Sequence, residues 1–322
     1  MKLRIAVAVL ALLVLVGWWS TPPGLDRAGD SPVLPVDLDA WLRDRESAID
    51  ERYGIVPGTE KLITWHDQPG VQTEYALVYL HGFSATRAEI APVPKRVAAA
   101  LNANLYESRL AGHGREAERL ESVAAEAWLE DGLEALAIGA AIGRKVILLG
   151  TSTGATLALA LADHELFESV DSLILLSPNL GFDDPAADWL TRPYGPLIAR
   201  ATIGEYREFQ PANDDQERYW TTRYPTAALV EMLRLLELAR ANLDQVSVPR
   251  ALLIYSSRDI VVSPQKYLDA FERLPAASKE RHEIIETSDS AYHVLTGDIL
   301  SPISVTPTVE RIVQFVAADA GP

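Results

Sequence analysis

The chain contains no cysteine, which excludes disulfide bonds, thiolate nucleophiles and cysteine-ligated metal sites. Basic residues are also few: 29 Lys and Arg stand against 45 Asp and Glu, which gives a formal net charge of -16 at pH 7. The phosphate backbone of a nucleic acid would on average be repelled, so we expect no nucleic-acid partner.

Two phosphate-binding patterns are missing as well. A P-loop requires Gly-Lys-Ser or Gly-Lys-Thr, whereas Gly154 is followed by Ala155, and the Gly-x-Gly-x-x-Gly spacing of dinucleotide-binding folds does not occur. No two histidines show metal-ligand spacing, and no carboxylate cluster accompanies them. We therefore expect neither a cofactor nor a metal.

What is present is a chain of 322 residues, 48% of them hydrophobic, which can fill the core of one large domain or two ordinary ones. Short apolar runs typical of strands alternate with longer amphipathic runs typical of helices. The expected strands are 62–65, 75–80, 104–106, 145–149, 172–176, 251–255 and 283–286, and the expected helices are 89–101, 123–142, 154–162, 265–274 and 309–317. The alternation predicts an α/β fold with a mostly parallel central sheet and helices on both faces. Reactive residues then collect at the carboxyl ends of the strands.

One interval interrupts the alternation. Residues 183–243 show no strand pattern, but they contain several Trp and Tyr residues and a clear helix over 226–241. We expect this interval to be a mostly helical cap over the carboxyl edge of the sheet, with most of its aromatic residues forming its own core.

The chain begins with the basic residues Lys2 and Arg4, followed by an uncharged apolar stretch over 5–19. Export machinery recognises such a start, so a buried core helix is the weakest interpretation. Trp18 and Trp19 stand where a signal peptidase needs small residues, which favours an uncleaved signal anchor over a cleaved signal peptide. In either case the body of the chain would be delivered outside the cytoplasm. We expect an exported, periplasmic or extracytoplasmic protein tethered to the inner membrane.

The sequence thus divides into three parts. Residues 1–21 are the signal anchor or signal peptide, and residues 22–38, which are rich in Pro, Gly and Asp, are a linker. Residues 39–322 form the α/β domain, with the cap at about 183–243.

A compact motif interrupts the apolar run KVILLGTSTGATLALALA, residues 145–162. A strand and a helix are joined there in so few residues that Ser152 must adopt a strained conformation, while Gly150 and Gly154 avoid clashes that a Cβ would cause. The hydroxyl projects from the strand end at the start of a helix, whose dipole favours developing negative charge. Ser152 is therefore the candidate nucleophile.

A serine hydroxyl needs a base and a group that orients the base. Asp259 follows the strand ALLIYSS and His293 follows the strand HEIIET, so both would lie at strand ends later in the chain. Ser263 and Pro264 already supply the cap and first residue of the next helix, which leaves Asp259 free of that duty. The order Ser, Asp, His favours a catalytic set over a turn aspartate and a surface-loop histidine.

The strand ALVYLHGF ends in His81, Gly82 and Phe83. A backbone N–H just beyond this strand can face a reacting carbonyl. We expect the N–H groups of Phe83 and Thr153 to form the oxyanion hole, and His81 to be structural.

Taken together, these residues resemble the α/β-hydrolase superfamily over 75–314. The motifs HGF, RLAGHG, GTSTG, SSRDIVVSP and YHVLTGD are particularly similar to the bacterial carboxylesterase and monoacylglycerol-lipase-like branch. Two features depart from that branch: the threonines on both sides of Ser152, which lies at the sharp turn called the nucleophile elbow, and the N-terminal anchor. The resemblance implies a helical cap and no cofactor. It places the nucleophile, base, orienting acid and two oxyanion donors at Ser152, His293, Asp259, Phe83 and Thr153, in that order.

The expected function is hydrolysis of carboxylic esters through an acyl-enzyme. A serine at the elbow, rather than an aspartate, argues against the dehalogenase and epoxide hydrolase branches. Thioesterase, peptidase, cofactor-free haloperoxidase or carbon-carbon hydrolase activity would use the same parts. A non-catalytic, membrane-tethered binding protein is the alternative from another class, and the complete catalytic set argues against it. An apolar, aromatic cap and a membrane tether favour hydrophobic acyl esters as substrates.

Overall fold

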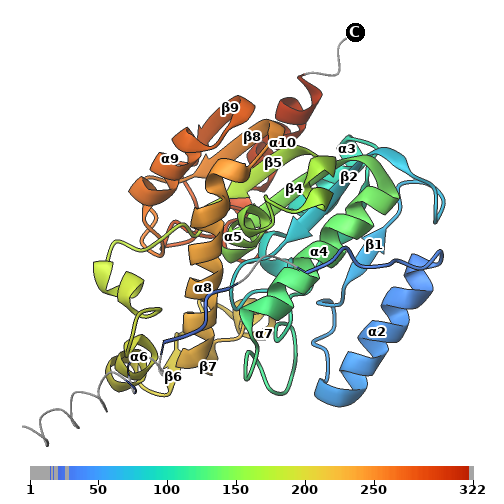
Figure 1. The fold of residues 1–322 in the computed structure, drawn as a ribbon. Helices are drawn as coiled ribbons and strands as arrows, with labels where there is room; N and C mark the ends of the chain where they lie inside the picture. Colours follow the sequence, from blue (N-terminus) through green and yellow to red (C-terminus); the bar gives the residue numbers. More distant parts are fainter. Residues whose placement is uncertain (1–14, 16, 18–20, 26–28, 319–322) are drawn as a thin grey trace, which may run out of the picture.

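A seven-stranded sheet forms the centre of the molecule (Figure 1), which is a computed structural model that describes residues 15, 17, 21–25 and 29–318. Its strand order is β1-β3-β2-β4-β5-β8-β9. Neighbouring strands of this sheet are parallel, except that β1 and β3 are antiparallel. The strands are β1 (Leu62–Thr64), β2 (Thr73–Leu80), β3 (Asn104–Glu107), β4 (Gly143–Thr151), β5 (Val170–Leu176), β8 (Val248–Tyr255) and β9 (Ala276–Glu283). The expected α/β class with a mostly parallel sheet is confirmed.

Helices cover both faces of the sheet (Figure 1). The core on one face includes α4 (Ala125–Ile142), α5 (Thr153–Ala160), α9 (Pro264–Arg273) and α8 (Thr226–Asn242), which packs mainly on α5. The core on the other face includes α3 (Val93–Ala100) and α10 (Val305–Ala317). Consecutive residues of a central strand therefore belong to different cores: Leu148 of β4 lies in the first cluster and Leu149 in the second. Burial on both faces explains why this strand is a continuous apolar run.

Helix α2 (Leu38–Tyr53) has no counterpart among the expected helices. Most of its surface is charged, and the buried stripe comprises only Leu38, Leu42 and Glu46, so the helical period is weak in the sequence. The side chain of Asp37 caps its first turn by accepting a hydrogen bond from the Ala40 N–H at 2.9 Å. Short 3-10 turns connect other elements: η1 (Arg87–Ile90), η2 (Glu165–Ser169), η4 (Leu243–Gln245) and η5 (Pro302–Ser304).

The interval between β5 and β8 contains the inserted elements. They are η3 (Pro185–Trp189), α6 (Gly195–Ile203), β6 (Tyr206–Glu208), α7 (Asp214–Tyr219), β7 (Arg223–Pro225) and α8. Strands β6 and β7 pair antiparallel in a small sheet of their own, although the sequence of this interval shows no strand pattern. Each strand has three residues, too few to show an alternating pattern.

Several expected boundaries also differ from the structure; α10, for example, begins at Val305, four residues before its expected start. The helix expected over 89–101 is divided into η1 and α3, because Pro92 lacks an N–H and Ala91 before it is extended. The last strand covers Ala276–Glu283 rather than 283–286. It is an edge strand whose residues are exposed or half-buried, so its pairing with β8 depends on backbone hydrogen bonds and not on an apolar pattern.

The predicted N-terminal anchor lies almost entirely outside the described residues. Within the described ranges, no helix is long and apolar enough to cross a membrane. Parts of the predicted linker lie against the domain: the Pro23 carbonyl accepts a hydrogen bond from Arg234 of α8 at 2.9 Å, and His164 Nε2 lies 3.1 Å from the Gly29 carbonyl.

Candidate active site

Four strands of the central sheet end at the same level. In the register of the sheet, Leu80 lies beside Gly150, Thr151 beside Leu176, and Leu176 beside Ile254. The residues that follow β2, β4, β5 and β8 therefore meet at one edge, which is the carboxyl edge of the parallel strands.

The turn from β4 to α5 holds Ser152 in a positive-φ conformation, with φ 51° and ψ -115°. A non-glycine residue rarely adopts this conformation, and it persists only where its surroundings enforce it. The Ser152 N–H donates to the Leu176 carbonyl at 2.9 Å. A Cβ on Gly150 would lie 2.6 Å from Ala155 Cα, and one on Gly154 would collide with carbonyl oxygens at the end of β2. Glycine at both positions lets the strand and the helix approach closely around the serine.

Ser152, His293 and Asp259 lie in one hydrogen-bonded chain. His293 Nε2 is 2.9 Å from Ser152 Oγ, and His293 Nδ1 is 2.8 Å from Asp259 Oδ2. The Asp259 side chain is fully buried. Its second oxygen, Oδ1, accepts hydrogen bonds from the N–H groups of Val261 at 2.8 Å and Val262 at 3.1 Å. The carboxylate is therefore held from one side while the other side contacts the imidazole.

The electrostatic surroundings of His293 make it a stronger base. Burial alone would lower the pKa of His293, but the Asp259 carboxylate raises it above its ordinary value, and Glu89 and Asp289 add to the rise. Asp289 also shapes the loop, because its Oδ2 accepts hydrogen bonds from the N–H groups of His293 at 3.0 Å and Val294 at 2.9 Å. A histidine base with this support can take a proton from a neighbouring hydroxyl.

Two backbone N–H donors lie close to the hydrogen-bonded series of Ser152, His293 and Asp259. Thr153 is the first residue of α5, and Phe83 follows the end of β2. Within the described part of the chain, the N–H groups of Phe83 and Thr153 have no hydrogen-bond acceptor. Both can therefore donate to an acceptor supplied by a bound molecule.

Two buried histidines hold the turn after β2. His81 Nε2 accepts a hydrogen bond from the Leu110 N–H at 3.0 Å, and His113 Nε2 accepts one from the Ser84 N–H at 3.1 Å. Each therefore carries its proton on Nδ1, where a backbone carbonyl accepts it. Burial lowers the pKa of His81 to about 4 and the pKa of His113 well below its ordinary value. Both rings are neutral near pH 7 and join this turn to the loop at 108–114.

The insertion contacts the same turn. The Phe83 ring packs edge to face against Tyr224 of β7, with ring centroids 5.1 Å apart, and against Trp128 of α4 at 6.1 Å. The Thr221 N–H donates to the Ser84 carbonyl at 2.7 Å. Aromatic side chains from the sheet edge, the insertion and α4 thus form an apolar wall beside the turn.

Sequence reasoning missed three residues that surround these groups: Glu89, His113 and Asp289. His113 belongs to the motif RLAGHG, and Asp289 lies four positions before His293, so both could have been examined as neighbours of known motifs. Glu89 carried no such signal. It stood at the start of an expected helix, where an acidic residue is ordinary.

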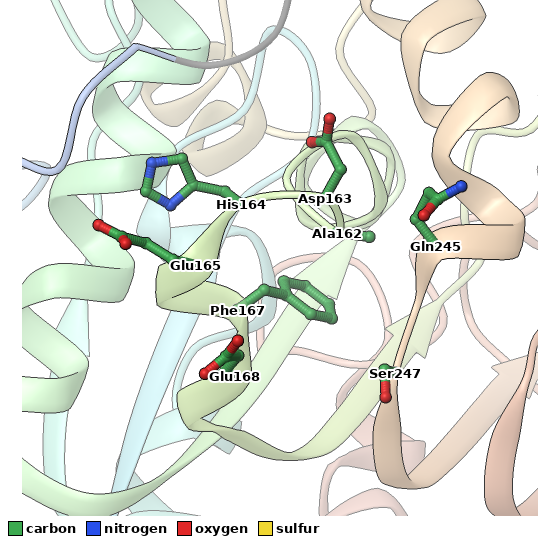
Figure 2. A pocket seen from close by; sticks show the side chains of 8 residues that line it. All are labelled: Ala162, Asp163, His164, Glu165, Phe167, Glu168, Gln245 and Ser247. Carbon is green, nitrogen blue, oxygen red and sulfur yellow. The ribbon is translucent and has the colours of Figure 1, made fainter.

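A separate hollow of about 400 Å³ lies at the other end of α5 (Figure 2). Ser152 precedes that helix and Ala162 lies just beyond its end, so the hollow is remote from the serine. Its lining comprises Ala162, Asp163, His164, Glu165, Phe167, Glu168, Gln245 and Ser247. No group of three or more His, Asp or Glu side chains within the described residues is arranged to hold a metal.

A strained serine between a strand and a helix, at the carboxyl edge of a mostly parallel sheet, is characteristic of serine hydrolases with the α/β-hydrolase fold. This class agrees with the sequence relationship of the chain. Residues 72–299 match the serine aminopeptidase S33 family, and the chain belongs to that family.

Several relatives are lipolytic enzymes. The thermostable monoacylglycerol lipase of Bacillus sp. (strain H-257) is 28% identical over 272 residues, which cover 84% of this chain and 99% of the relative. A solved structure from work on LipS and LipT, two metagenome-derived lipolytic enzymes, has a TM-score of 0.67 at 20% identity and covers 82% of this chain and 99% of its own. The Paleococcus ferrophilus monoacylglycerol lipase has a TM-score of 0.59 at 15% identity, with coverage of 80% and 99%. The solved structures share the fold, and the family makes this chain a serine hydrolase.

Proposed function

We propose that the protein hydrolyses carboxylic esters with hydrophobic acyl groups, through an acyl-enzyme formed on Ser152. The observation that carries the proposal is the buried hydrogen-bonded chain from Ser152 Oγ through His293 to Asp259, with distances of 2.9 and 2.8 Å. At the first distance the Ser152 hydroxyl proton can pass to His293 during attack, and at the second Asp259 holds the imidazole in place.

In the proposed reaction, Ser152 Oγ attacks the ester carbonyl carbon while His293 Nε2 takes the hydroxyl proton. The N–H groups of Phe83 and Thr153 stabilise the negative charge on the carbonyl oxygen. The protonated imidazole then gives its proton to the departing alkoxide. The alcohol dissociates, and Ser152 remains acylated. Water, deprotonated by His293, attacks the acyl carbon, and the acid leaves as the serine regains its proton. Asp259 keeps the imidazole in the correct tautomer and stabilises its protonated form.

Two observations support a hydrophobic acyl group. The aromatic wall of Phe83, Trp128 and Tyr224 lies beside one proposed oxyanion donor. The relative from Bacillus is a monoacylglycerol lipase by name. We therefore propose acyl esters of the monoacylglycerol kind as the substrate class.

The test is a p-nitrophenyl ester series of increasing acyl length, together with a monoacylglycerol, a thioester and an aminoacyl p-nitroanilide. We expect the wild type to hydrolyse the oxygen esters, with a preference for longer acyl chains, and to be labelled by a fluorophosphonate. Ser152→Ala should lower kcat by about 10⁴-fold or more. Ser169→Ala is the control, because Ser169 is a half-buried serine of η2 at the opposite edge of the sheet. This variant should retain wild-type activity. Hydrolysis of the anilide alone would support a peptidase, and no turnover with no labelling would refute the proposal.

We further propose that this activity is exported and tethered to the inner membrane by residues 1–21, on the strength of the basic start and the apolar stretch that follows it. The described Gly17, which falls within this segment, lies against Tyr194 of the insertion, just before α6. A reporter enzyme that is active only in the periplasm, fused after Pro35, should be active and should sediment with membranes. An inactive reporter in an expressed fusion contradicts the proposal.

A further inference from the structure

Glu89 is a buried carboxylate that the reaction described above does not use. It lies on η1 and is 2% exposed. Among the described residues no ion pair involves Glu89, and its neighbour Arg87 pairs instead with Glu107 at 3.3 Å. A carboxylate removed from water without a cationic partner is costly unless hydrogen bonds compensate it. The contacts of Glu89 therefore indicate what retains it there.

One oxygen of Glu89 connects two parts of the site. Its Oε2 accepts hydrogen bonds from the Gly82 N–H at 2.8 Å and from the Tyr79 hydroxyl at 3.0 Å. The Tyr79 hydroxyl makes a longer contact of 3.4 Å with Thr151 Oγ1. Gly82 immediately precedes Phe83, and Thr151 immediately precedes Ser152, so the network supports the turn after β2 and the serine turn together.

The bond to the Gly82 N–H constrains the turn that carries the first proposed oxyanion donor. A Cβ on Gly82 would lie 2.6 Å from Glu89 Oε1, so the carboxylate packs directly against this residue. With the Gly82 N–H occupied, the adjacent Phe83 N–H is the donor left available to a substrate. Oxyanion donors must be held close to their productive position, and a rigid neighbouring bond does this.

Glu89 also contacts the segment after His293. A Cβ on Gly297 would lie 2.5 Å from the Glu89 carbonyl oxygen, and the Asp298 N–H donates to the Ala91 carbonyl at 2.8 Å. Three carboxylates raise the pKa of His293: Asp259 through a direct bond, and Glu89 and Asp289 through space. Burial raises the pKa of Glu89, while its two hydrogen bonds and protonated His293 oppose that rise.

We propose that Glu89 is a positioning residue of this active site. It fixes the turn of the oxyanion donor through the Gly82 N–H, and as an anion it stabilises the protonated form of His293 that arises during the reaction. The inference rests on the proposed ester hydrolysis, but the roles it assigns to Glu89 can be measured separately.

The test uses Glu89→Gln, which keeps an oxygen acceptor and removes the charge, and Glu89→Ala, which removes both. Without the negative charge the pKa of His293 falls. The acid limb of kcat/KM, which reports protonation of His293, should then move to lower pH by about half a unit or more in Glu89→Gln. We expect kcat to fall about tenfold in Glu89→Gln and about 100-fold in Glu89→Ala, with little change in KM.

Glu107→Gln is the matched control, because Glu107 is also a buried carboxylate but is not among the groups acting on His293. It should leave the acid limb unchanged. An NMR titration of the His293 imidazole in the wild type and Glu89→Gln needs no turnover, so it separates this inference from the ester hydrolysis itself. If Glu89→Ala does not fold, the titration and the Glu89→Gln profile decide. An unchanged pKa of His293 in Glu89→Gln, or wild-type kcat in Glu89→Ala, overturns the proposal.

Discussion

Replacing Asp259 by Asn changes the hydrogen bonding of His293 while keeping the volume of its partner. Oδ1 of Asp259 accepts two backbone hydrogen bonds, from Val261 and Val262. An Asn at this position must keep its carbonyl oxygen toward those donors, so its NH₂ group faces His293 Nδ1. The NH₂ donates to Nδ1 and moves the imidazole proton to Nε2. There it faces Ser152 Oγ, and the ring can no longer accept the hydroxyl proton.

The expected loss is large because the wrong tautomer removes the general base. In a serine protease triad, the corresponding substitution lowers kcat about 10⁴-fold, which amounts to about 5 kcal/mol of transition-state stabilisation. We expect a loss of this order, since the Asp259 side chain is fully buried and water cannot substitute for its contact with His293.

The assay is kcat on the preferred p-nitrophenyl ester near pH 7.5, with circular dichroism and thermal unfolding as checks of folding. Asp269→Asn is the control, because Asp269 is an exposed carboxylate of α9 and its neutralisation should change kcat by less than about twofold. A folded Asp259→Asn enzyme that keeps kcat within tenfold of the wild type would refute the tautomer argument.

Three further predictions concern stability. Gly154→Ala forces a Cβ against backbone oxygens of β2 and should lower Tm by about 10 °C or prevent soluble expression; an unchanged Tm contradicts the steric argument. The pKa of His81 is about 4 in the folded protein and about 6.5 in the unfolded chain. Below pH 6.5 the unfolded chain therefore binds a proton that the folded protein does not. The free energy of unfolding should fall as the pH is lowered toward 4, and His81 should account for about 3 kcal/mol of this fall. Urea titrations at pH 7 and 4.5 should show that the free energy of unfolding falls more in the wild type than in His81→Gln. Equal falls in the two proteins would contradict this role of His81. Lys61→Met removes the buried cation that Lys61 Nζ supplies to Asp131 at 2.8 Å and to Glu134 at 2.5 Å, and leaves Arg45 at 3.1 Å as the cation beside Glu134. The substitution should cost about 3–5 kcal/mol in urea unfolding; a cost below about 1 kcal/mol would contradict this prediction.

Local rules predicted most of the central sheet. Strands buried on both faces read as apolar runs, and α4, α5 and α9 begin within two residues of their expected starts. The errors occur where the local signal is weak. β9 is an exposed edge strand bearing charged side chains, β6 and β7 have three residues each, and α2 has a narrow buried stripe. Their positions depend on pairing and packing with distant parts of the chain.

The candidate residues divide in the same way. The glycines around Ser152 were visible in the sequence, because a strand and a helix joined in a few residues leave no space for a Cβ. Asp259 and His293 followed from their places after strands. Glu89 and His113 did not, because their roles depend on backbone groups of another segment: Glu89 bonds the Gly82 N–H seven positions away, and His113 accepts from the Ser84 N–H across 29 positions.

By itself the sequence determined the α/β class, the order of its elements and the strained serine turn, because short-range sterics and hydrophobic period govern these features. Only the tertiary structure decided which polar groups become buried together, and so how the two His293 nitrogens are shared between Ser152 and Asp259. The same burial decided that His81 is held neutral while His293 gains basicity. Desolvation and hydrogen-bond geometry arise when separate segments exclude water from a common edge of the sheet.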